Sequence, residues 1–342
     1  MSVIRKIGLL ITIVCCLFGC TAQNDGDEYL DRLSRVLEVE RPERDPMHLE
    51  FPPLRDLAFE QKKNSISIKS FLGLRECRLH TVIAERNSQL GRVASASQRL
   101  FSDLKILNTG PECLTKLESG EFKTTLSAYL NEKQEAIPKV LAHALLAQPE
   151  YKTLWHAKSN LENYPKYLPS NSIINDLAML DFFANQVLKG DYQLTDSELD
   201  DIELALGRLR FGDAGHLLQE LEKLKSVLEA ANGMIKQKLS KKLCANTKPT
   251  PNSKYFQNVV GLYFIEKIQP RLVLLSQRFQ QLMPTLKRFE KTLSAYSQTK
   301  FINWIEQRNE RFEKALNAPR EHAILIQALF DQCGIQNGNR TN

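Results

Sequence analysis

The fold of this chain is decided by residues 214–243, which read AGHLLQELEKLKSVLEAANGMIKQKLSKKL. Apolar side chains recur there at alternating spacings of four and three, in the set Leu217, Leu221, Leu224, Leu228, Ala231 and Ile235, extended by Leu239 and Leu243. A period of 3.5 residues is typical of helices that pack side by side along their length. We therefore predict one helix here, which would be about 45 Å long at 1.5 Å per residue.

The same alternation returns further along the chain, in Leu272, Leu275, Phe279, Leu282, Leu286, Phe289, Leu293 and Tyr296. Pro284 lies inside this second stretch and should bend it, because proline removes one hydrogen bond of a helix. If the two helices are antiparallel, the segment after Phe301 runs back along them, with an interruption near Pro319. The sequence thus predicts an all-α, multi-helix bundle with long, heptad-patterned antiparallel helices in its C-terminal half.

Shorter helices are predicted in the rest of the chain. Leu, Glu, Lys, Gln and Ala are abundant whereas glycine and proline are sparse, and this composition favours helix. The expected ranges are 27–38, 67–87, 95–107, 121–147 with a kink at Pro138, 149–160, 172–188 and 197–210. Ser95 and Ser97 are candidate N-caps, and Thr195 with Glu198 has the spacing of a capping box. No strand-like alternation of comparable quality is present.

The first twenty residues have the pattern of a lipoprotein leader. Arg5 and Lys6 precede a short apolar run that ends in Leu17-Phe18-Gly19-Cys20, which resembles a bacterial lipobox. The run is shorter than the roughly 20 apolar residues that a membrane-spanning helix needs, so a cleaved leader is the better interpretation. We expect Cys20 to become the acylated first residue of the mature chain. Thr21 follows it, and the absence of Asp at that position favours the outer membrane.

Four segments are expected from this pattern. Residues 1–19 are the leader, and residues 20–64 are a lipidated tether in which four prolines favour an extended spacer. Residues 65–190 form a first helical lobe and residues 191–342 a second. The alternative is one continuous helical domain, because the 323 residues after the leader lie near the size at which single cores divide.

Four cysteines follow Cys20, namely Cys77, Cys113, Cys244 and Cys333. An even number in an oxidising compartment suggests disulfides, for which three connectivities exist. We favour Cys77–Cys113, because a hairpin of the first two helices would bring these residues together. An antiparallel bundle in the C-terminal half would likewise carry Cys333 toward Cys244. Buried free thiols are the alternative.

Charge and motifs argue against several classes of function. The formal charge of +6 falls to +4 once Arg5 and Lys6 are removed with the leader, which is too mild to indicate nucleic-acid binding. The His-Glu-x-x-His, Gly-x-Ser-x-Gly, P-loop and Gly-rich dinucleotide patterns are absent from the sequence. We therefore predict no catalytic residue, metal site or cofactor, although a site assembled from distant residues stays open.

Two groups of polar residues are candidates for binding. Glu85, Arg86 and Asn87 end a predicted helix and either hold a ligand or partner or simply fix the hairpin. The second group is Lys236, Lys238, Lys241 and Lys242, in a stretch without Asp or Glu from Ala230 to Ile265. Such a patch could contact anionic lipid, peptidoglycan or an acidic partner. The simpler interpretation is a solvated helix end whose lysines complement the helix dipole.

Three short motifs carry a resemblance to a known family. They are residues 74–77 (LREC), 83–91 (IAERNSQLG) and 97–100 (SQRL). The chain resembles a family of uncharacterised lipoproteins from Gram-negative proteobacteria, catalogued as a domain of unknown function. The resemblance implies a lipoprotein and covers most of the mature chain. It implies no activity and no site residue.

The sequence therefore predicts an all-helical protein that is held to the outer membrane through Cys20 and faces the periplasm. The leading hypothesis is a structural or interaction module with an envelope protein or peptidoglycan as its partner. The alternative is an envelope enzyme that acts on a cell-wall or lipid substrate.

Overall fold

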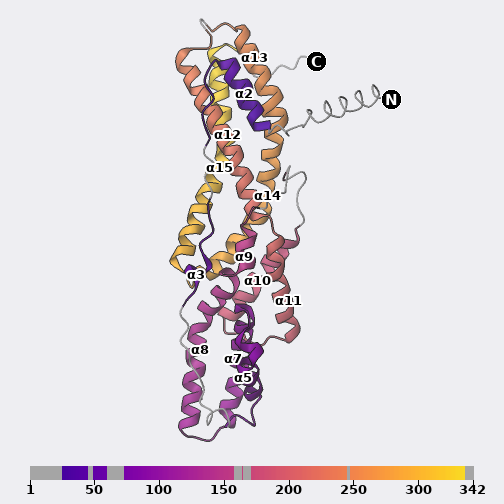
Figure 1. Ribbon diagram of the computed structural model, residues 1–342, viewed down its shortest axis with the longest axis vertical. Coiled ribbons are helices and arrows are strands. Elements are labelled where there is room, and N and C mark those ends of the chain that lie inside the picture. The colour runs from indigo at the N-terminus through magenta and orange to yellow at the C-terminus, as the bar shows by residue number, and fades with distance from the viewer. Residues whose placement is uncertain are drawn as a thin grey trace, which may run out of the picture. The chain divides into compact units, whose positions relative to one another are not determined.

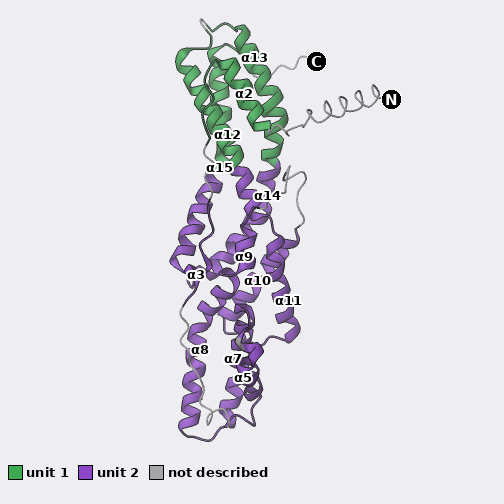
Figure 2. Cartoon of the chain, in the orientation of Figure 1, with its two compact units in different colours: residues 1–46, 223–273, 315–342 green, residues 47–222, 274–314 purple. Residues whose placement is uncertain are grey.

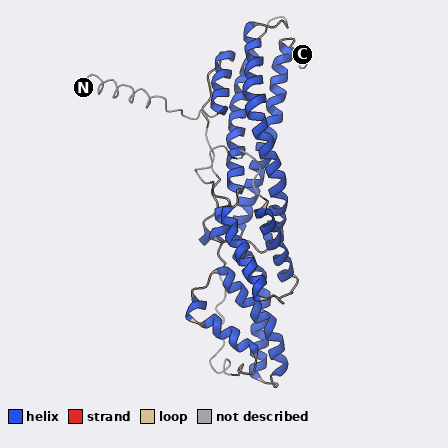
Figure 3. Ribbon diagram, turned by 90° about the vertical axis from the view of Figure 1, so that its right-hand side faces the viewer, coloured by secondary structure: helices blue, strands red, loops and turns tan. Residues whose placement is uncertain are grey.

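A computed structural model describes residues 25–44, 49–59, 73–157, 164, 171–244 and 247–335. These residues form helices and connecting loops, with no strand among them (Figures 1 and 3). The all-α prediction is therefore confirmed. The expected leader and Cys20 lie outside the described residues.

Helices α2 (Asp25–Leu37), α3 (Leu54–Leu57), α5 (Arg78–Asn87), α6 (Gln89–Arg92) and α7 (Ala96–Lys116) begin the described chain. They are followed by α8 (Glu121–Leu146), α9 (Pro149–Leu154), α10 (Ser172–Leu188), α11 (Asp196–Arg208) and the short 3-10 helix η1 (Leu209–Phe211). The last third holds α12 (Ala214–Lys241), α13 (Pro251–Val259), the π-helix η2 (Val260–Ile268), α14 (Gln269–Ser294) and α15 (Thr299–Gln332). Most predicted ranges agree with these bounds within a few residues.

The chain divides into two compact units (Figure 2). Unit 1 comprises residues 1–46, 223–273 and 315–342, and unit 2 comprises residues 47–222 and 274–314. This division differs from the expected boundary at residue 190, which assumed that each lobe is one continuous piece of sequence. It differs because α12, α14 and α15 each contribute residues to both units, so segments far apart in sequence group together.

In unit 1, α2 packs along α13 and η2. Its apolar side chains are fully buried, namely Tyr29, Leu30, Leu33 and Leu37. Helix α2 runs antiparallel to the stretch formed by α13 and η2. Asp25, at the start of α2, lies 3.3 Å from Lys267 near the end of η2, whereas Glu38, just after α2, accepts a hydrogen bond from Asn252 of α13 at 3.3 Å. Residues 25–37 are thus a packed helix inside the range expected to be a tether.

The long antiparallel helices of the C-terminal half are confirmed. In unit 2, Arg278 of α14 donates a hydrogen bond to Asp213, just before α12, at 2.7 Å. In unit 1, Glu38 contacts both Lys238 near the end of α12 and Asn252 near the start of α13. One prediction is wrong: Pro319 does not interrupt α15. A proline removes only one backbone donor, and buried Ala315 and Ala318 hold the turns before it in the core.

Two further predictions about the N-terminal hairpin of unit 2 are wrong in their bounds. The start expected at Ser67 lies outside the described residues, and α5 begins at Arg78 because residues 73–77 form turns in which Cys77 donates to the Leu74 carbonyl at 2.8 Å. The helix expected to end at Leu107 continues through Pro111 to Lys116. Its last turns bury Gly110 and Cys113, and that packing outweighs the one hydrogen bond that Pro111 lacks.

Candidate functional site

Both favoured disulfides are present. Cys77 is joined to Cys113 in unit 2, and Cys244 is joined to Cys333 in unit 1. The first pair lies in the apolar core between α5, α7 and α8, beside Leu79, Ile106 and Leu126. Because such bonds persist in oxidising compartments, the two disulfides indicate an extracytoplasmic location.

Of the three hairpin candidates, the structure brings only Arg86 into a polar cluster. Arg86 forms an ion pair with Asp103 of α7 at 2.8 Å, and Lys133 of α8 reaches the same carboxylate at 2.8 Å. Asp103 is only 2% exposed, so this carboxylate joins three helices from inside unit 2. Glu85 and Asn87 are exposed on α5. This arrangement supports the interpretation that the helix end fixes the hairpin.

The electrostatics of this cluster follow from its burial. Burial lowers the pKa of Lys133, although the Asp103 carboxylate opposes that effect. Burial also raises the pKa of Tyr129, whose hydroxyl accepts a hydrogen bond from Arg86 at 3.4 Å. Two cations share one carboxylate here, so the cluster carries one excess positive charge.

The candidate lysines lie at the C-terminal end of α12 in unit 1. Lys238 is within 3.5 Å of Glu38, and its side chain is only 14% exposed. Lys236, Lys241 and Lys242 are exposed. Lys242 adopts a left-handed backbone conformation, with φ of 57°, directly after the helix ends. The structure therefore leaves three of the four lysines open to solvent at one helix terminus.

A buried polar cluster that sequence reasoning missed lies in unit 2. Arg308 of α15 is fully buried and donates two hydrogen bonds to Glu290 of α14, at 2.5 and 2.7 Å. Tyr151 of α9 donates to the same carboxylate. The guanidinium also lies over the rings of Trp155 and Trp304, 4.3 and 5.1 Å from their centroids. Desolvation raises the pKa of Tyr151 well above its usual value, so the hydroxyl keeps its proton.

A second buried cluster lies in unit 1. His322 of α15 is fully buried between Tyr29 of α2 and Asn232 of α12, with its ring nitrogens 2.8 and 2.6 Å from their oxygens. Because the Asn232 carbonyl oxygen only accepts, Nδ1 carries the proton and Nε2 accepts from the Tyr29 hydroxyl. Burial lowers the pKa of His322 to about 3, so the ring stays neutral. This cluster fixes α2 against two long helices.

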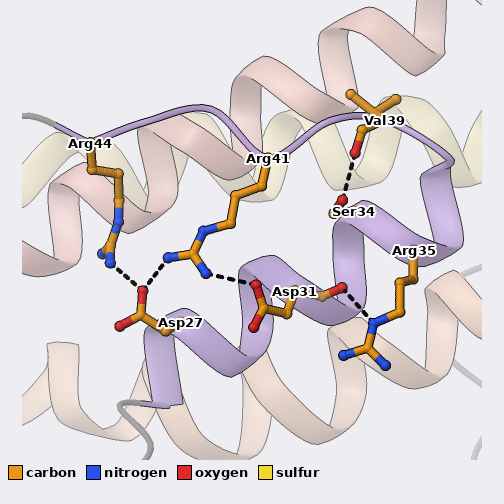
Figure 4. Close-up of polar contacts among 7 residues, drawn as sticks. All are labelled: Asp27, Asp31, Ser34, Arg35, Val39, Arg41 and Arg44. Atoms are coloured by element: carbon orange, nitrogen blue, oxygen red, sulfur yellow. Dashed lines mark hydrogen bonds and ion pairs between the residues drawn. The ribbon is translucent and has the colours of Figure 1, made fainter.

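A polar clamp, defined as Arg41, Arg44, Asp27 and Asp31, holds the segment after α2 (Figure 4). Arg41 and Arg44 both pair with Asp27, and Arg41 also donates to Asp31 at 2.6 Å. One turn further on, Ser34 donates to the Val39 carbonyl at 2.6 Å. The clamp folds residues 38–44 back along α2, within unit 1.

Unit 2 also contains a small cavity near its aromatic residues. The cavity is lined by Leu57, Phe59, Lys139, His143, Ser297 and Phe301, among others, and has a volume of about 20 Å³. Burial lowers the pKa of His143. A space of this size holds about one water molecule. The cavity is therefore too small for a sugar or lipid substrate.

Metal ligation and membrane insertion were the two remaining roles for the described residues. No group of three His, Cys, Asp or Glu side chains there is arranged to hold a metal ion. No helix in the same part of the chain combines the length and apolar character needed to cross a bilayer.

These observations define an all-helical, disulfide-bonded protein whose described polar clusters are packed between its helices. The chain belongs to the family described as protein of unknown function (DUF3080), whose model matches residues 26–337. Comparison with curated proteins and with solved structures found no match. Because the family is described only as a protein of unknown function, membership assigns neither an activity nor site residues to this chain.

Proposed function

We propose that this chain is a bacterial lipoprotein that is anchored in the outer membrane through acylated Cys20. Its helical body faces the periplasm and serves as a structural or interaction module for an envelope protein or for peptidoglycan. The observation that carries the proposal is the complete pairing of the four body cysteines, downstream of a predicted leader that is followed directly by Cys20.

The pairing supports the anchor in two ways. Disulfides within the body fit export from the cytoplasm, which is what the leader predicts. The four body cysteines also form disulfides with one another, so none of them needs Cys20 as a partner. A cysteine at the end of a short apolar leader is then best explained by acylation. Several acyl chains anchor a protein firmly, whereas a single chain binds only marginally.

Exposed apolar side chains support an interaction role. Met179 and Phe182 lie three residues apart on α10 in unit 2, and they are 40% and 66% exposed. Leu204, on the neighbouring helix α11, is 59% exposed. Large exposed apolar side chains are candidates for contact sites. The lysines at the end of α12 add a cationic surface in unit 1. The cavity beside His143 holds about one water, so this cavity does not support the enzyme alternative.

In-cell cross-linking followed by mass spectrometry tests the interaction role. We expect reproducible cross-links from α10, α11 or the α12 lysines to one envelope protein, or retention of the body on peptidoglycan sacculi. A charge-reversed variant, in which Lys236, Lys241 and Lys242 become Glu, separates the cationic surface from the apolar one. Turnover of a wall or lipid substrate by the purified protein, without any captured partner, would favour the enzyme instead.

Membrane fractionation tests the address independently. The wild-type chain should sediment with the outer membrane on a density gradient. A Cys20→Ser variant should lose that position, because the acceptor sulfur is gone. A wild-type chain recovered in the soluble periplasmic fraction would contradict the anchor.

A further inference from the structure

Large apolar side chains are exposed along one continuous helical stretch of unit 1. On η2, Leu262 is 52% exposed and Ile265 is 47% exposed, and Val273 on α14 is 49% exposed. The other side of η2 buries Val260 and Phe264 in the core. The stretch is therefore apolar on both sides: its inner side is packed in the core, and its outer side is exposed, with the exposed Glu266 next to Ile265.

The start of α2 is fixed beside this uncovered side. Lys267 lies 3.3 Å from Asp25 and 3.4 Å from Glu28, and the Tyr263 hydroxyl donates to Glu28 at 2.9 Å. These contacts place the first turn of α2 against the last turns of η2. Leu262 precedes Lys267 by five residues, which is about one turn of a π-helix.

The sequence limits how far this site can lie from an acylated Cys20. Only residues 21–24 separate Cys20 from Asp25. Five Cα–Cα steps span at most about 17 Å, whatever conformation the segment adopts. If Cys20 is held at a bilayer, the outer side of η2 is therefore kept within a few tens of ångströms of that bilayer.

The side chains beside the apolar residues suit a lipid interface. The Lys267 ammonium lies 5.0 Å from the centroid of the Tyr263 ring, and the Arg32 guanidinium lies 5.9 Å from it. Tyrosine is enriched at the headgroup level, and lysine and arginine extend apolar stems toward it while their charges stay in water. An interfacial helix combines such a polar flank with apolar side chains on its inserted side.

We propose that the outer side of η2 and the start of α14 lies on the phospholipid bilayer that holds Cys20. Leu262 and Ile265 enter the boundary between headgroups and acyl chains. The contact orients the body at the membrane surface, whereas the acyl chains supply the attachment. This inference rests on the proposed lipid anchor and adds the surface by which the body meets the lipid.

Site-specific photo-cross-linking in the full chain tests the inference. Benzoylphenylalanine is introduced separately at Leu262, at Ile265 and, as a control, at Ile324 on α15, which is also in unit 1 and 59% exposed. Ile324 follows His322 by two residues, and His322 faces Phe264 of η2, so Ile324 points away from η2. Cells are labelled with [32P]phosphate, irradiated, and the protein is purified under denaturing conditions. The acyl anchor contains no phosphorus, so 32P on the protein reports cross-linked phospholipid.

We expect light-dependent 32P several-fold above the Ile324 control at both η2 positions. Equal labelling at all three positions, no labelling, or a protein adduct at Leu262 or Ile265 overturns the inference. Parallel labelling with [3H]palmitate separates the two proposals. A palmitate-labelled chain without 32P at η2 leaves the anchor intact and removes the docking surface, whereas a chain without palmitate removes both. Mobility on non-reducing gels shows whether each variant has formed its disulfides.

Discussion

Removal of the disulfide between Cys244 and Cys333 should destabilise the protein strongly. The two cysteines are 89 residues apart, and the chain-entropy model gives about 4.6 kcal/mol for a loop of that length. The Cys77–Cys113 loop of 36 residues gives about 3.8 kcal/mol in the same model. Each value is a large fraction of the net stability of roughly 5–15 kcal/mol typical of native proteins.

The assay is urea denaturation of three proteins, namely the wild type and the two double variants in which either cysteine pair becomes serine. Far-UV circular dichroism follows the helices of both units. Fluorescence follows unit 2, because Trp155 and Trp304, the two tryptophans of the chain, both lie there. We expect each double variant to lower the unfolding midpoint, with the Cys77–Cys113 variant shifting the fluorescence transition. Four free thiols in the oxidised wild-type body, or unchanged midpoints in both variants, would refute the reasoning.

Three further predictions concern the polar clusters. Glu290→Gln should lower the free energy of unfolding by about 3–5 kcal/mol, since it leaves Arg308 buried without a counter-charge; a loss below 1 kcal/mol in thermal or urea unfolding would count against a buried pair. Burial depresses the pKa of His322 in the folded protein to about 3, so protonation of this ring opposes folding. The free energy of unfolding therefore keeps the full contribution of neutral His322 above about pH 6.5. It loses that contribution as the pH falls toward 3, by at most about 1.4 kcal/mol per pH unit. His322→Gln should flatten that acid limb in urea titrations between pH 7 and 4, and an unchanged slope would show that the ring is not a source of it. The double variant Arg41→Ala, Arg44→Ala should speed amide hydrogen exchange in residues 38–44, with a stability loss on the order of 1 kcal/mol per half-exposed pair; unchanged exchange would mean that the clamp does not hold the segment.

A matched control for the buried pair is Lys300→Gln. Lys300 lies 3.0 Å from Asp56, but its side chain is 65% exposed. An exposed pair contributes about 0–1 kcal/mol, so this variant should unfold almost like the wild type. The contrast with Glu290→Gln then reports burial rather than the loss of an ion pair as such.

The long helices could be predicted from the sequence because their pattern is strongly periodic. Leu217, Leu221, Leu224 and Leu228 keep one face apolar over several turns, and each is buried. Local chemistry also predicted the start of α11, where Thr195 and Glu198 form a capping box. The disulfide pairs followed from the antiparallel topology, since helix ends that must meet can be located by counting residues.

The π-helix could not be predicted in the same way. The buried residues of η2 recur every four positions, at Val260, Phe264 and Ile268, and this spacing also predicts an ordinary α-helix. Two lobes were expected, but the discontinuous make-up of the two compact units was not, because it depends on contacts between segments far apart in the chain. Pro319 was given too much weight, since it lies inside a helix that packing sustains.

The buried polar clusters were missed for another physical reason. A single charged residue in an apolar stripe does not reveal its partner, and Glu290, Arg308 and Tyr151 come from three separate helices. The two tryptophans of the chain were the available signal for a buried arginine, because an arginine side chain is often stacked on aromatic rings. Arg86 was a binding candidate in the sequence, and its internal partner Asp103 becomes evident only when α5 and α7 are packed together.

The intact mass of the protein purified from a Gram-negative membrane tests the account most directly. We predict a mature chain that begins at Cys20, carries a diacylglyceryl group and an amide-linked acyl chain, and is lighter by four hydrogen atoms because of its two disulfides. Reduction should restore four thiols, and alkylation should place them on Cys77, Cys113, Cys244 and Cys333. A chain that retains the leader, or that starts at another residue without fatty acid, would contradict the anchor and the proposed lipid-facing side of η2.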